Sequence, residues 1–180
     1  MYSNEQSGLL EQIQPAIQPL TETGDFYLKS ISINDFESAI IIQLSSPGLE
    51  MRYGATAIHS HVNCVFIIHS LKKFFSIDYL SPALKLNITI NKGEFLENYP
   101  SPPSGIIETT EKYQARWDAI LKGVNFIEEL NRQCIGIRDN LPEIRRAFSP
   151  ENIDETVRVY SAEYKKTNPL ATGPFCNLDE

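Results

Sequence analysis

Residues 58–75, IHSHVNCVFIIHSLKKFF, decide the fold, and they hold all three histidines of the chain and one of its three cysteines. An apolar run from Val62 to Ile68 forms the middle of this stretch. As a strand, it would alternate between two faces of a sheet. As a helix, it would place one apolar stripe on a single face, comprising Cys64, Ile67, Ile68, Leu71, Phe74 and Phe75. The helical spacing matches more positions, so the sequence favours a helix over residues 61–76, with a strand as the alternative.

Outward from this stretch, the hydrophobic periodicity predicts helices and strands on both sides. Before it comes an amphipathic helix at 4–20, which either breaks near Gln14 and restarts or has Pro15 in a first turn. A hairpin of strands 25–33 and 38–45 follows, and residues 49–57 form either a third strand or the lead into the central stretch. After it come a clearly alternating strand at 83–90, a Pro-rich loop at 97–105, and three helices. The helices are expected at 106–131, at 141–148 with Pro142 in the first turn, and from a Ser149 cap to about 167, with a break at 136–140.

This order predicts an α+β fold with a small antiparallel or mixed sheet of three to five strands. The sheet is packed by an N-terminal helix, a central helix and a helical C-terminal third. Residues 1–168 are expected to form one domain, with the sheet in about 1–105 and the helical part in about 106–168. Residues 169–180 are expected to be an irregular tail.

Composition narrows the possible partners and the location. The net charge of −7 argues against binding to nucleic acid or to an anionic membrane. No apolar run reaches the roughly 18 residues of a membrane span, and the N-terminus does not resemble a signal peptide. The cysteines, Cys64, Cys134 and Cys176, are far apart and odd in number, which predicts reduced thiols and a cytoplasmic protein.

The histidine-containing stretch offers the candidate metal ligands His59, His61, Cys64 and His69. On a strand, His59 and His61 point the same way and could bind zinc or another transition metal together. A Cys–His nucleophilic pair or a histidine acid–base group are further alternatives. The favoured interpretation is that these histidines flank a core element, so that no cofactor is expected. The sequence contains no phosphate-binding loop and no GxSxG motif.

The segment FLENYPSPPSGI, residues 95–106, follows the alternating strand and precedes a long helix. This passage resembles the strand, YPxxPP and helix of ubiquitin-conjugating and RWD-type domains, over about residues 84–105. No HPN tripeptide follows Pro103, so the resemblance implies a non-catalytic binding domain.

The sequence therefore favours a non-enzymatic protein-binding module, such as an adaptor, a specialised chaperone or a complex subunit. Its partner is expected to be another protein or a second copy of the chain. A small metal-dependent or His/Cys-based enzyme is the alternative. The candidate contact residues are aromatic and proline residues of the Pro-rich loop and the C-terminal helices: Tyr99, Pro100, Pro102, Pro103, Tyr113, Trp117, Tyr160 and Tyr164.

Overall fold

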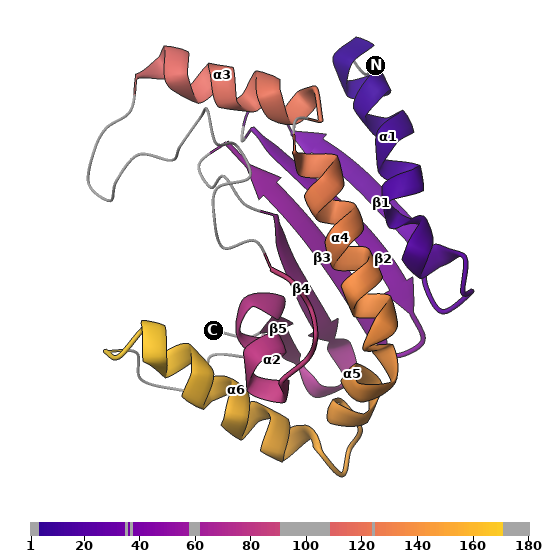
Figure 1. The fold of residues 1–180 in the computed structure, drawn as a ribbon, viewed down its shortest axis with the longest axis vertical. Coiled ribbons are helices and arrows are strands. Elements are labelled where there is room, and N and C mark those ends of the chain that lie inside the picture. Colours follow the sequence, from indigo (N-terminus) through magenta and orange to yellow (C-terminus); the bar gives the residue numbers. More distant parts are fainter. Residues whose placement is uncertain are drawn as a thin grey trace.

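The computed structural model describes residues 4–34, 36, 38–57, 62–90, 109–123 and 125–170 (Figure 1). These residues form a five-stranded sheet with helices, which confirms the predicted α+β class. The strands are β1 (Tyr27–Asn34), β2 (Ala39–Ser46), β3 (Leu49–Thr56), β4 (Asn63–Ile68) and β5 (Lys73–Ser76). The α-helices are α1 (Asn4–Thr21), α2 (Ile77–Leu84), α3 (Thr110–Leu121), α4 (Phe126–Asp139), α5 (Leu141–Ala147) and α6 (Ile153–Thr167), and a short 3-10 helix, η1, covers His69–Leu71.

The strands lie in the sheet in the order in which they occur in the chain, and every neighbouring pair is antiparallel. The predicted hairpin is confirmed as β1 and β2, and Asn34 Oδ1 accepts a hydrogen bond from the Phe36 amide in their turn. Gly48, with φ +76°, supplies the turn between β2 and β3. The register of β1 shifts between Leu28 and Ser30, so Lys29 occupies a bulge on an edge strand.

Alternation divides the strand residues between two faces. The core face joins the buried side chains of the helices in one apolar cluster, and α1 and α4 lie side by side across it (Figure 1). Its strand residues include Ile40, Ile42, Leu44, Met51, Tyr53, Ala55, Cys64, Phe66, Ile68 and Phe75. We call the opposite side the outer face. Its residues include Tyr27, Ser30, Ser32, Ile41, Gln43, Ser45, Glu50, Arg52, Gly54, Asn63, Val65, Ile67, Phe74 and Ser76. None of these described residues belongs to the core cluster.

The helix favoured at 61–76 is wrong for the described residues, which form β4, η1 and β5. The strand alternative is correct, because β4 pairs with β3 on one side and with β5 on the other. Lys72 adopts φ +50° and lets the chain return after η1. The apolar stripe that suggested a helix is split between the faces, with Phe75 in the core and Phe74 outside. A short apolar run beside an existing strand satisfies its backbone by completing the ladder, whatever its helical spacing.

The strand predicted at 83–90 is also wrong. Helix α2 runs to Leu84, with the Ser76 hydroxyl capping its first turn, and residues 86–90 pair with no described strand. Instead this extended segment lies against α4. Asn140 hydrogen-bonds both backbone groups of Asn87, and Ile88 packs on Gly136, where an added Cβ would be 3.0 Å from the isoleucine Cγ2. The alternation in the sequence therefore reflects one buried side, not membership of a sheet.

Four features of the helices also differ from the prediction. The single helix expected at 106–131 is divided into α3 and α4, because Gly123 (φ +75°) and Asn125 (φ +56°) leave helical geometry. The break expected at 136–140 is absent, since α4 continues to Asp139. Helix α1 runs through Pro15 and Pro19 without ending, and α6 starts at Ile153 rather than after Ser149. The short helix with Pro142 in its first turn is confirmed as α5.

Replacing two glycines by alanine should change the free energy of unfolding in opposite directions and so test the backbone geometry. Gly123→Ala should lower the free energy of unfolding by about 1 kcal/mol or more, because φ is positive and the new Cβ would lie 2.9 Å from Gln12 Oε1. Gly8→Ala, inside α1 with nothing within 4 Å of the new Cβ, should raise it by about 0.5–1 kcal/mol. Urea unfolding of both variants checks this, and a Gly123 variant as stable as the wild type would contradict the break between α3 and α4.

Candidate functional site

The predicted metal ligands are not brought together within the described residues. Cys64 is buried on the core face, opposite Tyr53 of β3. His69 lies beyond the end of β4, and its Nε2 is 3.3 Å from Glu50 of the outer face. The sheet therefore separates the two candidate ligands. His59 and His61 lie outside the described residues, and no group of three histidine, cysteine, aspartate or glutamate side chains in the described part of the chain is placed to hold a metal.

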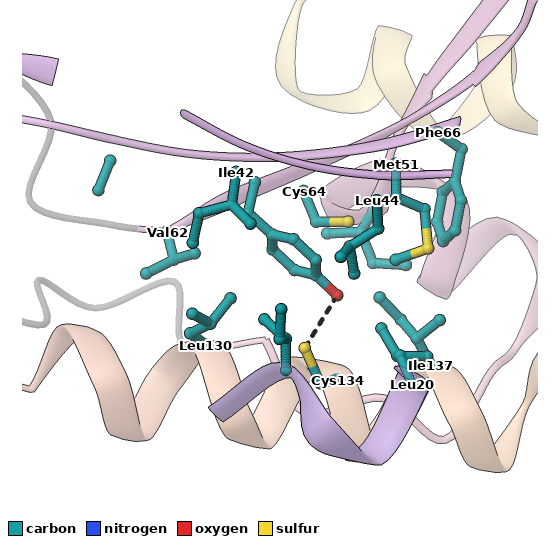
Figure 2. Packing of buried hydrophobic residues seen from close by; sticks show 14 of the residues in the cluster. Leu20, Ile42, Leu44, Met51, Val62, Cys64, Phe66, Leu130, Cys134 and Ile137 are labelled. Atoms are coloured by element: carbon teal, nitrogen blue, oxygen red, sulfur yellow. Dashed lines mark hydrogen bonds between the residues drawn. The ribbon is translucent and has the colours of Figure 1, made fainter. Parts of the chain in front are cut away.

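Two thiols meet a phenol in the middle of the core. The thiol of Cys134 on α4 donates a hydrogen bond to the Tyr53 hydroxyl at 3.4 Å, and Figure 2 draws this bond as the dashed line from Cys134. Burial raises the pKa of Cys134 to about 12 and raises the pKa of Cys64 well above its usual value. Burial also raises the pKa of Tyr53. Both cysteines are therefore protonated near neutral pH, and neither has the exposed thiolate that a nucleophile needs.

The aromatic residues predicted to bind a partner pack within the chain. Tyr160 is 1% exposed, its hydroxyl accepts a hydrogen bond from the Ser76 amide, and its ring contacts Phe75 and Tyr79. Tyr79 in turn contacts Tyr164, and Trp117 is 3% exposed. Tyr113 and Tyr164 are half-buried. Tyr99, Pro100, Pro102 and Pro103 lie outside the described residues, so the predicted contact surface stays a prediction, and Trp117 and Tyr160 have almost no exposed surface to contribute to it.

A buried carboxylate with three cationic or polar partners lies on the outer face. Glu50 Oε2 is 2.9 Å from Lys29 Nζ and 3.3 Å from His69 Nε2, and Oε1 is 2.8 Å from Arg52 Nε. The Glu50 side chain is 4% exposed, whereas those of Lys29, Arg52 and His69 are 50%, 46% and 63% exposed. The carboxylate is thus covered by the groups that neutralise it.

The ionisation of Glu50 follows from this geometry. Burial alone would raise its pKa, but the hydrogen bonds from Lys29, Arg52 and His69 favour the carboxylate more strongly and lower the pKa to about 2. Because an ionised carboxylate only accepts hydrogen bonds, His69 must carry a proton on Nε2 to bond with it. Glu50 therefore stays negatively charged at all physiological pH values, and with Lys29 and Arg52 the cluster carries a net positive charge.

A second polar cluster is buried where β3 ends and β4 begins. Arg116 of α3 donates from Nε to the Ala57 carbonyl at 2.6 Å, and Gln133 of α4 donates to the Val62 carbonyl at 3.0 Å. Gln133 also donates to Glu129, and Gln133 Oε1 has no hydrogen-bond partner among the described residues. The two helices therefore hold both ends of the β3–β4 connection through buried polar side chains.

Sequence reasoning found neither polar cluster. Lys29 lies 21 positions before Glu50 and His69 lies 19 positions after it, and only the pairing of the strands brings the three together. Glu50 and Arg52 are two residues apart in a strand, which puts both on one face, and this was the available signal. For Arg116 and Gln133, nothing in the helical pattern marks them as buried.

Comparison with family models, with curated proteins and with solved structures found no match to this chain. Among the described residues, no helix combines the length and the apolar character needed to cross a membrane. The resemblance over residues 84–105 loses its strand, since residues 86–90 are unpaired, and its proline motif lies outside the described residues.

Replacing the buried carboxylate of Glu50 should lower the free energy of unfolding at neutral pH but not at low pH. Glu50→Gln should cost roughly 1–3 kcal/mol at pH 7, because it leaves Lys29 and Arg52 without a buried counter-charge. The folded pKa of Glu50 is below its unfolded value of 4.5, so its contribution is complete above that pH and is lost as the pH falls toward 2. Urea unfolding across this range should show the gap between wild type and variant closing. Glu128→Gln is the control, since Glu128 is 76% exposed beside Arg132 and should cost less than about 0.5 kcal/mol. A gap that stays constant with pH would contradict the assignment.

The buried thiols should resist alkylation. Iodoacetamide should leave Cys64 and Cys134 unmodified in the native protein at mildly alkaline pH, because both are fully enclosed and protonated. Peptide mapping by mass spectrometry checks each site, with the guanidinium-unfolded protein as the positive control. Modification of either cysteine in the native protein at the unfolded rate would show that its thiol is reachable and would reopen a catalytic role.

Proposed function

We propose that this protein is a non-enzymatic protein-binding module of the cytoplasm that binds its partner through the outer face of its sheet. The observation that supports this is a set of exposed residues on that face. Tyr27 is 61% exposed, Ile41 is 41% exposed, and the Arg52 side chain is 46% exposed. Aromatic, aliphatic and arginine side chains on a rigid surface are the residue types that contribute most to protein interfaces.

The register arranges these residues in rows across the strands. One row runs Tyr27, Ser45, Glu50, Ile67, Phe74 from β1 to β5. The next row places Arg52 of the middle strand between Gln43 and Val65. Ile41 lies in the third row, beside Gly54. The charged cluster therefore has apolar neighbours on β4, Val65 and Ile67, and polar neighbours on β2, Gln43 and Ser45. Such a mixture of polar and apolar side chains is expected of an interface that forms and dissociates.

The cytoplasmic location is supported by the cysteines. Cys64 and Cys134 are free and buried, and the cytoplasm keeps thiols reduced. The partner is proposed to be another protein acting with this chain as an adaptor, a specialised chaperone or a complex subunit. A second copy of the chain is the alternative occupant, and sedimentation equilibrium distinguishes the two.

An outer-face variant should lose the partner without unfolding. The double variant Tyr27→Thr/Ile41→Thr keeps strand-forming residues and should reduce recovery of a cross-linked, affinity-purified partner from the native cells by about tenfold or more. Ile135→Gln on α4 is the matched control, because Ile135 is 38% exposed, close to the 41% of Ile41. The control should recover the partner fully, and all three proteins should melt within a few degrees of one another. Equal recovery by both variants, or no specific partner with the wild type, would contradict the proposal.

A further inference from the structure

We infer that the outer face binds an acidic, amphipathic protein segment, whose carboxylates bond to Arg52 and Lys29 while its apolar side chains pack on the neighbouring strand residues. This inference rests on the proposed function and names the partner's chemistry. Three observations support it: the local positive charge, hydrogen-bond donors that have no partner among the described residues, and the apolar side chains beside them.

The outer face is positive on a chain that is negative. The chain has a net charge of −7, yet the described charged residues of this face and its bulge are Lys29, Glu50 and Arg52. The carboxylate lies beneath and the cations lie above, since Glu50 is 4% exposed and Lys29 and Arg52 are about half exposed. A partner that approaches the sheet therefore meets cationic groups first, which favours a segment of opposite charge.

The cations keep donors available after they have neutralised Glu50. Arg52 uses only Nε for this bond, so among the described residues its two terminal nitrogens have no partner. These two nitrogens match the two oxygens of one carboxylate. Lys29 uses one of its three donors on Glu50, and His69 uses Nε2. The existing bonds fix the cations in place, which lowers the entropy cost of binding a further anion.

The apolar requirement comes from the residues beside the cluster. Val65 is the cross-strand neighbour of Arg52, and Phe74 is the neighbour of Ile67. Tyr27 and Ile41 are exposed on the same face. A purely anionic ligand would leave this apolar surface in water, whereas an acidic segment that also carries apolar side chains would cover it.

Two other occupants fit less well. A second copy docked through the same face by a two-fold axis would bring Arg52 and Lys29 toward their own copies, which costs energy. The phosphates of a nucleic acid could bond to Arg52 and Lys29, but the net negative charge of the whole chain would repel them. Both become outcomes of the test.

The test uses a displayed library of random peptides, selected on the full-length protein. The peptides enriched should be net acidic and should contain apolar residues. A synthetic peptide made from the enriched sequences should bind Arg52→Gln at least tenfold more weakly than wild type, and Lys29→Gln several-fold more weakly. Arg158→Gln is the matched control, because Arg158 is 70% exposed on α6 and pairs with Glu155, and it should change affinity less than twofold. Rising salt should weaken binding to the wild type more than to Arg52→Gln.

Each other result overturns the inference. Enriched peptides that are neutral or basic but lose affinity on Tyr27→Thr/Ile41→Thr would leave the proposed function standing and remove only the acidic partner. Acidic peptides that bind Arg52→Gln as well as wild type would place the contact elsewhere. If a single-stranded DNA oligonucleotide is bound as tightly as the peptide and loses affinity on Arg52→Gln, that result would show that Arg52 and Lys29 bind phosphate rather than a carboxylate. A dimer that dissociates on Tyr27→Thr/Ile41→Thr would assign the face to a second copy, and no enrichment over a surface without protein would remove the inference and its premise together.

Discussion

The fold depends on how one phenol is buried. Tyr53 lies on the middle strand, is fully enclosed, and has its hydroxyl in an otherwise apolar core. Leaving a buried hydroxyl without a partner costs about 1–3 kcal/mol. Cys134 of α4 supplies that partner and is small enough to sit directly under the sheet (Figure 2). The position of α4 over β3 is therefore set by one hydrogen bond as well as by apolar packing, and α1 packs beside α4 on the same face.

Strand β3, which carries Tyr53, also determines which charged side chains lie on the outer face. Because side chains alternate along β3, placing Tyr53 in the core places Glu50 and Arg52 outside. An ionised Glu50 is stable there only because Lys29 and Arg52 cover it. Ile67, its cross-strand neighbour, is 4% exposed although it lies outside the core cluster, so the surroundings of the carboxylate are partly dry. A drier environment strengthens these charged hydrogen bonds and holds the cations in fixed positions.

Local signals predicted the parts of the fold that local interactions decide. The N-terminal helix, the first hairpin and α5 follow from periodicity, turn residues and a proline in the first turn. The segments 61–76 and 83–90 failed because their conformation is set by neighbours far away in the sequence. β4 is a strand because β3 and β5 flank it, and residues 86–90 are unpaired because Asn140 and Gly136 hold them on α4. The Glu50 cluster was missed for the same reason, since Lys29 reaches Glu50 only through the pairing of β1, β2 and β3, and His69 only because β4 pairs with β3.

The outer face carries exposed apolar side chains that the stability of the chain does not require. A sheet packed by helices on one side needs only polar residues on the other, and Ser30, Ser32 and Gln43 meet that need. Tyr27 and Ile41 instead remain exposed, although solvating their apolar surface costs about 25 cal/mol for each Å². Arg52 likewise keeps two nitrogens unbonded within the described residues while a third neutralises Glu50. Exposed apolar area next to donors that have no partner among the described residues lowers the stability of the isolated chain. A complementary surface that covers this area recovers that free energy, and this is the physical reason for assigning function to the outer face rather than to the buried thiols of Cys64 and Cys134.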